Sequence, residues 1–471
     1  MEHQLYNQLI KDFEDQSLYE KALSFGLEYM EQVRDRNVDP TESAVQALEA
    51  FDEEFPETSV PAKEVMQQLH QFGSPATMAQ LGGRYFGFVN GSVVPVGLAA
   101  KTLATFWDQN SALAVMSPLV SKLETVVQNW FVDLFGFPKN TVAGFVSGTS
   151  AANLCGLAAG RFRLLNNQGW DIHKKGTFGA PKIRVITGKQ AHSSAIRALW
   201  LLGFGEEDIE YVEVDEQGRM KAELLPELDS TCLVVLQAGN VNSGAFDPFE
   251  AICQKAQAAK AWVHVDGAFG LWAGALDQMK HLTKGMEMAN SWAVDGHKTL
   301  NTPYDSGIVM CNDEQALVSS LHTKGSYLVL SEEKDGMFYT PDMSRRSRII
   351  ELWAIMKYLG KAGINQMIYG LHERAVQFAE ELSHADGFEV LNDVVFNQVL
   401  VQCETDELTE RTMKRIQELR TCWVGGSSWF GRKVIRISVC SWVTNEEDVR
   451  LSVESFKLAL SQVKEEMQSI V

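Results

Sequence analysis

Hydrophobic positions follow two different periods along the chain, and the change between them separates candidate regions. Up to about residue 75 the sequence is charged, and Leu5, Leu9 and Phe13 recur at helical spacing. This stretch predicts a helical N-terminal arm. A second helical stripe predicts an ordinary packed helix, and it consists of Leu119, Leu123, Val126, Val127, Trp130 and Leu134.

Short apolar runs alternate with helical segments from about 140 to 320. They are too short for helices and too uniformly apolar for half-exposed strands. Such runs are typical of strands buried on both faces in a largely parallel sheet, with helices on either side. The runs are Val142–Val146, Ile183–Thr187, Cys232–Leu236, Trp262–Val265, Trp292–Val294 and Ile308–Met310.

The pattern changes again after about residue 345. A long helical region follows, with breaks expected near Gly360 and Gly363, and strands are expected at 397–402 and 434–439. Thr444 and Glu447 fit a capping box, which predicts that a last helix begins at Thr444. We therefore expect a helical arm over 1–80, a large α/β domain over 81–345 and a small α+β domain over 346–471.

Composition and charge narrow the class of protein. The chain has 471 residues, 45% hydrophobic and 22% charged, which is a globular composition. The net charge is −19 without a basic stripe, so neither nucleic acid nor an anionic membrane is an expected partner. The acidic N-terminus does not resemble a signal peptide. The seven cysteines are scattered without zinc spacing, which predicts reduced thiols in the cytoplasm and no metal site.

Candidate chemistry lies directly after the predicted strands, where ligands bind in open α/β sheets. The first run leads into Ser147-Gly148-Thr149-Ser150 and an alanine-rich helix. Free N–H groups and the helix dipole would make this turn an anion site, although a plain strand-to-helix turn explains it equally well. His192 follows the second run, and a lone histidine of this kind is more often structural than catalytic.

A carboxylate and a lysine follow two further strands. Asp266 ends an apolar run and is costly to bury without a cation, and Lys298 follows another run in "VDGHKTLN". A buried ammonium costs several kcal/mol unless it is paired or loses its charge. An anion site, an imidazole, a carboxylate and a lysine at one sheet edge together match pyridoxal 5′-phosphate (PLP), whose aldehyde forms an imine with a lysine.

Three motifs carry a family resemblance: "QAHSSAIRA" (190–198), "HVDGAFG" (264–270) and "DGHKTLN" (295–301). They resemble the fold-type I, PLP-dependent group II amino-acid decarboxylases, which include aromatic-L-amino-acid and glutamate decarboxylases. The resemblance extends over roughly 80–460. It implies a mostly parallel seven-stranded sheet and a cytoplasmic homodimer whose N-terminal helices wrap the partner. It also implies that an L-amino acid loses CO2 through a Lys298 Schiff base and leaves as an amine.

The resemblance also implies roles for single residues. Asp266 would bond the pyridinium nitrogen, Ala268 would pack under the ring, and His192 would stack on its other face. Thr149, Ser150 and His297 would hold the phosphate. The implied cofactor-binding set is Gly148, Thr149, Ser150, His192, Asn240, Asp266, Ala268, His297 and Lys298.

The substrate side of the site rests on fewer residues. Tyr339 is the candidate for protonating Cα, with a surface tyrosine as the alternative, and with Lys298, His192 and Asp266 it completes the catalytic set. Arg436 would approach the substrate carboxylate, or else form a structural salt bridge. Phe88, in "GRYFGFVNGS", would line the substrate pocket unless it belongs to the core.

One departure from the family pattern concerns the phosphate. Asp295 stands where some relatives have an asparagine, and an anion there would weaken phosphate binding unless it points away. Two alternatives to decarboxylation stay open at this point. The same electron sink serves aldol cleavage, transamination and C–S lysis, and a PLP-binding protein without catalytic activity is also conceivable.

Overall fold

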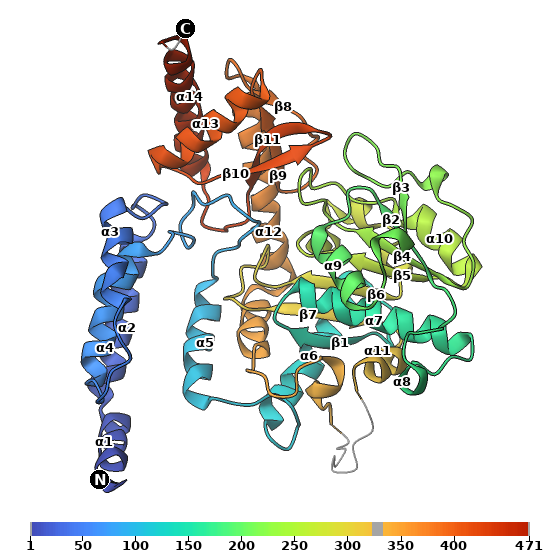
Figure 1. Cartoon of the computed structure of the whole chain (residues 1–471), viewed down its shortest axis with the longest axis horizontal. Coiled ribbons are helices and arrows are strands. Elements are labelled where there is room, and N and C mark those ends of the chain that lie inside the picture. The colour runs from blue at the N-terminus through green and yellow to red at the C-terminus, as the bar shows by residue number, and fades with distance from the viewer. Residues whose placement is uncertain (1, 323–332, 470–471) are drawn as a thin grey trace.

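The computed structural model describes residues 2–322 and 333–469. Its centre is a seven-stranded sheet (Figure 1) in which five adjacent strands run parallel and β7 is antiparallel to both of its neighbours. This confirms the predicted α/β class and sheet. The strand order is β1 (Val142–Val146), β7 (Gly307–Cys311), β6 (Ser291–Asp295), β5 (Trp262–Asp266), β4 (Cys232–Gln237), β2 (Arg184–Gly188) and β3 (Ile209–Val212).

Helices cover both faces of this sheet, which is why its strands are continuous apolar runs. One face packs on α7 (Thr149–Asn167), α9 (Ser193–Leu201) and α11 (Glu314–Leu321), with α8 (Ile172–Lys175) nearby. The other packs on α6 (Pro118–Phe135), α10 (Phe249–Ala259) and the first half of α12 (Ile349–Ser383). The pattern missed β3, because this edge strand is only partly buried.

A second, four-stranded antiparallel sheet lies in the C-terminal part of the chain. Gly360 interrupts α12 with φ 58° and ψ −176°, as predicted, whereas Gly363 stays helical. The second half of the helix packs on this sheet. The predicted domain boundaries remain predictions. The strand order is β10 (Gly425–Trp429), β11 (Arg432–Ser438), β9 (Gln398–Gln402) and β8 (Glu389–Val390), covered by α13 (Asp406–Leu419) and α14 (Glu446–Ser469).

The predicted capping box of the last helix was wrong by one residue. Asn445 Oδ1 accepts the Asp448 N–H at 3.0 Å, and Asp448 Oδ2 accepts the Asn445 N–H at 3.1 Å. Thr444 instead donates its hydroxyl to the carbonyl of Gly83 at 2.8 Å. A tertiary contact therefore takes the threonine, and the helix begins one residue later.

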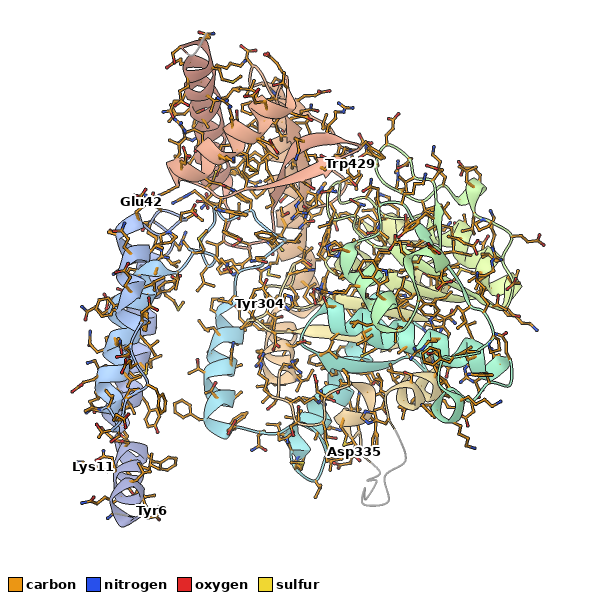
Figure 2. All side chains as sticks on the ribbon, viewed as in Figure 1. Tyr6, Lys11, Glu42, Tyr304, Asp335 and Trp429 are labelled. Carbon is orange, nitrogen blue, oxygen red and sulfur yellow. The ribbon has the colours of Figure 1, made fainter. Side chains whose placement is uncertain are left out.

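The N-terminal segment is helical, and its extent as an arm over 1–80 remains a prediction. Its helices stand beside the body of the molecule as a separate column (Figure 1), and Figure 2 shows Tyr6, Lys11 and Glu42 along it. Large apolar side chains on the column are exposed, including Leu9 at 58% and Phe13 at 75%. Within residues 2–322 and 333–469, no helix combines the length and apolar content needed to cross a membrane. The helices are α1 (Glu2–Glu14), α2 (Gln16–Gln32), α3 (Glu42–Gln46) and α4 (Ala62–Gln68), and α5 (Pro95–Trp107) follows.

Candidate active site

Several of the predicted site residues lie where the parallel strands end. Asp266 closes β5, and Lys298 follows β6. The turn before α7 lies at the same edge because Gly307, at the start of antiparallel β7, is packed against Gly148. A Cβ at Gly307 would lie 2.4 Å from the Gly148 Cα, so only glycine allows this approach. The sheet therefore brings together side chains that are more than 100 residues apart.

Lys298 has an anionic partner at the end of its buried strand. Its Nζ lies 3.0 Å from Oδ2 of Asp295, which is 2% exposed. The other carboxylate oxygen, Oδ1, accepts the N–H of Thr149 at 2.7 Å. Asp295 therefore points at the amino end of α7 and does not point away from the expected phosphate position.

The donors around this helix end fit a phosphate. Thr149 Oγ1 is buried and has no hydrogen-bond partner among the described residues. Arg197 Nη2 reaches Ser150 Oγ at 3.2 Å, which brings a cation to the turn. His297 Nε2 lies 3.6 Å from Asp295 Oδ2, and burial lowers the pKa of His297. An unused hydroxyl and a guanidinium at the start of a long helix together favour a phosphate ligand.

Asp266 is held by hydrogen bonds on both oxygens. Its Oδ1 accepts the Ala268 N–H at 3.2 Å, and its Oδ2 accepts Nδ2 of Asn153 at 2.9 Å. The carboxylate is 5% exposed, and Ala268 beside it is half-buried. A fixed carboxylate at this position fits the pyridine nitrogen of PLP. Sequence reasoning missed Asn153, which lies inside a helix and is brought to Asp266 only by packing.

His192 begins α9 and caps it. Its Nδ1 accepts the Ser194 N–H at 3.2 Å, so the proton of the neutral ring is on Nε2. Burial lowers the pKa of His192, Asp266 partly raises it again, and Lys298 and Arg436 lower it further. Gln237, which the sequence did not indicate, accepts the His192 N–H at 3.1 Å and positions it.

Asn240 has a local task in this structure. Its Oδ1 accepts the Asn242 N–H at 2.9 Å, and its Nδ2 donates to the Gln190 carbonyl at 3.3 Å. The side chain is 2% exposed. It therefore shapes the loop after β4, and its predicted contact with the cofactor remains a prediction.

Arg436 lies in β11 of the C-terminal sheet, and Phe88 packs on Trp423, just before β10. No carboxylate of the described residues is in ion-pair range of Arg436, and burial lowers its pKa. Phe88 is 64% exposed, and its ring centroid lies 5.3 Å from that of Trp423. Tyr85 stacks on the same indole at 5.2 Å. The described residues therefore support neither a structural salt bridge for Arg436 nor a core position for Phe88.

Tyr339 does not join the site within this chain. Its hydroxyl donates to Glu314, just beyond β7. The end of β7 pairs with the start of β6 at Ser291, so Glu314 lies at the opposite end of the sheet from Lys298. Within this chain its segment packs along the edge of β1, so the assignment of Tyr339 as the proton donor remains a prediction. Part of the loop proposed to carry this tyrosine, 331–332, lies outside the described residues.

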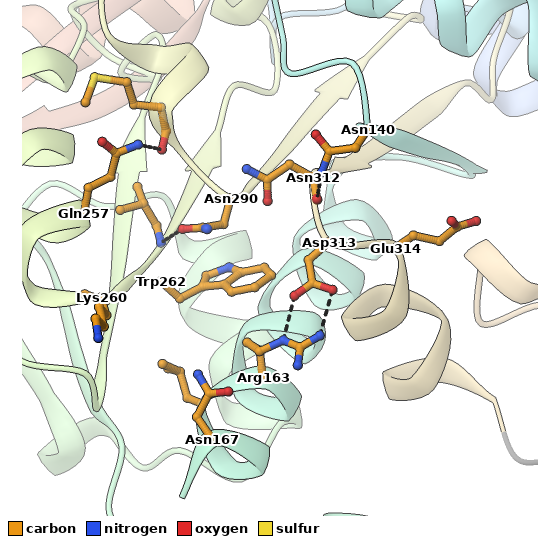
Figure 3. A pocket seen from close by; sticks show the side chains of 14 residues that line it. Asn140, Arg163, Asn167, Gln257, Lys260, Trp262, Asn290, Asn312, Asp313 and Glu314 are labelled. Atoms are coloured by element: carbon orange, nitrogen blue, oxygen red, sulfur yellow. Dashed lines mark hydrogen bonds and ion pairs between the residues drawn. The ribbon is translucent and has the colours of Figure 1, made fainter.

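Glu314 also borders a cavity of about 670 Å³ at this opposite end of the sheet (Figure 3). Asp313 accepts two hydrogen bonds from Arg163 there, at 2.6 and 2.9 Å. The amide of Asn290 caps a strand by accepting the Val263 N–H. Arg163 and Asn290 thus have partners within the fold, and the cavity is separate from the Lys298 site.

Comparison with known proteins agrees with this geometry. The family model described as "Pyridoxal-dependent decarboxylase conserved domain" matches residues 45–403, more than half of the chain. An aromatic-L-amino-acid decarboxylase of Bacillus atrophaeus is 26% identical over 422 residues, 85% of each protein. Tryptophan decarboxylase 1 of Oryza sativa subsp. japonica is 24% identical over 485 residues, 95% of this chain and 94% of the relative.

Solved structures show the same fold. The crystal structure of Oryza sativa TDC with PLP and tryptamine matches with a TM-score of 0.87 and 23% identity, over 95% of this chain and 97% of that one. Mouse CSAD matches with a TM-score of 0.87 and 19% identity, over 94% and 98%. With the family match and a site that fits the cofactor, the chain belongs to the pyridoxal-dependent decarboxylases and is a PLP-dependent amino-acid decarboxylase.

Proposed function

We propose that this decarboxylase acts on an L-amino acid with an aromatic side chain. The observation that carries the proposal is an arginine with no ion-pair partner among the described residues, beside three stacked rings of which Phe88 is exposed. Gly425 lies opposite Arg436 in the β10–β11 ladder, and a Cβ there would be 3.7 Å from the Trp423 ring. Trp423 stacks on Phe88 and Tyr85. Arg436 offers a charge for the α-carboxylate, and the rings offer an apolar, stacking surface for the side chain.

The names of the relatives support this substrate class. Among the similar curated proteins are aromatic-L-amino-acid, tryptophan and tyrosine decarboxylases. An acidic amino acid decarboxylase of the mouse is also similar, at 25% identity over 67% of this chain. An acidic side chain would need a second unpaired cation, whereas the rings beside Arg436 carry no charge.

The chain's own residues would divide the work as follows. Lys298 would hold the cofactor aldehyde, Asp266 the pyridine nitrogen, and the turn at Thr149 the phosphate. Ala268 would leave room for the ring on one side, and His192 would cover the other. PLP supplies an aromatic system that accepts the electron pair left when the bond from Cα to the carboxylate breaks. Arg436 and His192 would orient that carboxylate for cleavage.

The lysine assignment is tested by chemical trapping. The protein is incubated with PLP, reduced with borohydride and digested, and the peptides are analysed by mass spectrometry. We expect a reduced adduct on Lys298 and none at this position in Lys298→Ala. Adduct formation at other lysines alone would reject the assignment.

The substrate is tested by product analysis. Tryptophan, tyrosine, phenylalanine, glutamate and aspartate are supplied as L-amino acids, and CO2 and amine are measured together. We expect release from aromatic substrates, with KM raised in Arg436→Met. Release from the acidic substrates alone would contradict the proposed class. A keto acid, or an aldehyde with glycine, as the main product would instead point to transamination or aldol cleavage.

We also propose that the protein is a cytoplasmic homodimer. The exposed apolar side chains of α1 and α5, such as Leu9, Phe13 and Phe106, would be covered by a second copy. All seven cysteines are free and buried, which suits a reducing compartment.

A further inference from the structure

Strand β5 presents three polar or amphipathic side chains to the same helix. Trp262, His264 and Asp266 alternate with Val263 and Val265, so they share the face that packs on α7. Their exposed fractions are 3%, 0% and 5%. Only Asp266 has a place in the proposed function. The imidazole behind it is a buried titratable group without an assigned task.

Helix α7 is shaped to fit this row of side chains. A Cβ at Gly156 would lie 2.5 Å from Cε1 of His264, and one at Gly160 would lie 2.8 Å from Cδ1 of Trp262. Neither distance is sterically possible, so the two glycines allow the helix to pass over the rings. Asn153, one turn before Gly156, is 0% exposed and reaches Asp266 and His264. Helix and strand together therefore enclose one continuous chain of hydrogen bonds between side chains.

The direction of each hydrogen bond follows from its chemistry. An ionised carboxylate only accepts, so the amide nitrogen of Asn153 must face Asp266, with Nδ2 2.9 Å from Oδ2. The amide oxygen of Asn153 then faces His264 Nε2 at 2.9 Å. Because an amide oxygen only accepts, Nε2 of His264 carries the proton and donates it.

The far side of the imidazole completes the chain. Burial lowers the pKa of His264 to about 3, so the ring is neutral and its Nδ1 accepts. Ser291 Oγ lies 2.8 Å from this nitrogen and donates to it, and Trp262 Nε1 donates to the same hydroxyl at 3.2 Å. All four donors therefore point towards Asp266, and bonds aligned in this way polarise one another.

We propose that Asn153 and His264 are positioning residues that keep Asp266 ionised and oriented towards the pyridine nitrogen of the cofactor. This inference rests on the proposed role of Asp266. Donors that point at a carboxylate favour its charged form. An ionised Asp266 in turn favours a protonated pyridine ring, which is the form that accepts electrons. The chain of hydrogen bonds ends at the indole N–H of Trp262 and includes no acceptor that could take a proton away from Asp266.

The test measures the pyridine nitrogen directly. The holoenzyme is prepared with PLP that carries an NMR-active nitrogen isotope in its ring, and the nitrogen shift is followed against pH. We expect His264→Leu and Asn153→Leu to lose the ring proton about one pH unit or more below the wild type, a roughly tenfold weaker protonation. His264→Gln should titrate close to the wild type, because its side-chain N–H can replace the donor at Nε2.

Controls separate positioning from general damage to the fold. His372 makes a hydrogen bond to the Phe396 carbonyl away from this chain, and His372→Leu should titrate as the wild type does. Ser291→Ala removes only the hydroxyl that donates to His264, and it should shift the titration in the same direction by less. If His264→Leu does not retain PLP, the titration of Ser291→Ala tests the positioning role in its place.

Two outcomes would overturn different claims. Asp266→Asn should shift the titration strongly, and an unchanged titration in this variant would refute the proposed role of Asp266 itself. If Asp266→Asn shifts the titration while Asn153→Leu and Ser291→Ala titrate as the wild type does, only the positioning role of the chain is refuted.

Discussion

Replacing Asp295 by asparagine should strengthen the binding of PLP. Asp295 Oδ1 accepts the Thr149 N–H at 2.7 Å, and Oδ2 is paired with Lys298 at 3.0 Å. The carboxylate therefore binds the Thr149 N–H and the Lys298 ammonium, which are the two groups that PLP needs. A phosphate that accepts the Thr149 N–H must displace this oxygen and then lie near a negative charge.

The size of the effect follows from these contacts. A hydrogen bond to a charged group contributes about 1.5–3 kcal/mol and one to a neutral group about 0.5–1.5 kcal/mol, so the amide is displaced more easily by roughly 1 kcal/mol. Two like charges about 5 Å apart repel by roughly 3 kcal/mol at an effective dielectric constant of about 20. Partial screening at Lys298, whose side chain is 21% exposed, reduces that amount. We expect a net gain of about 1.4–2.8 kcal/mol, or roughly 10- to 100-fold.

The assay is a titration of the apoprotein with PLP in phosphate-free buffer, followed by absorbance. Inorganic phosphate, used as a competitor, should also bind more tightly to Asp295→Asn. This result would show that the substitution acts on the phosphate group of PLP and not on its aldehyde. Asp277→Asn is the control, because it removes the same charge from an exposed ion pair with Lys280. Equal or weaker PLP binding by Asp295→Asn, with the control unchanged, would show that the carboxylate does not oppose the phosphate.

Three further predictions concern assembly and stability. Leu9→Asp with Phe13→Asp should yield monomers in analytical ultracentrifugation, whereas Gln4→Asp should not; a monomeric wild type would refute the dimer. Glu124→Ala should lower the free energy of unfolding by about 3–5 kcal/mol in urea, because Arg345, 2.7 Å away and 2% exposed, would keep a buried unpaired charge. Glu447→Ala, in an exposed pair with Arg450, should cost at most about 1 kcal/mol, and similar losses in both would contradict this reasoning. Finally, burial lowers the pKa of His264 from 6.5 to about 3, so only the unfolded chain is protonated at this residue between those values. The contribution of the neutral His264 ring to the free energy of unfolding is complete above pH 6.5. It falls by up to about 1.4 kcal/mol for each pH unit below that value. His264→Gln should show a shallower fall in acid denaturation, and an equal slope would rule out this origin.

Some features of the protein are local and could be read from the sequence. Strands buried on both faces have apolar side chains at most positions, and all six predicted runs overlap strands. Lys298 and Asp266 stood out because charged residues at the ends of such strands need a partner. The alternation of Trp262, His264 and Asp266 was also visible, and it could have indicated that the three side chains share a face.

Other features depend on which segments pack together. Asn153 donates to a carboxylate 113 residues away, and Asp295 accepts from a helix end 146 residues away. Thr444 fitted a capping box by spacing, and the family resemblance implied a role for Tyr339, but Gly83 and Glu314 bind their hydroxyl groups. A short polar side chain takes whichever partner the fold brings within about 3 Å, and its neighbours in sequence do not specify that partner. The strand pattern thus determined at which edge of the sheet the site residues lie. The packing of α7 on β5 and β6 decided which side chains bind Asp266 and Asp295.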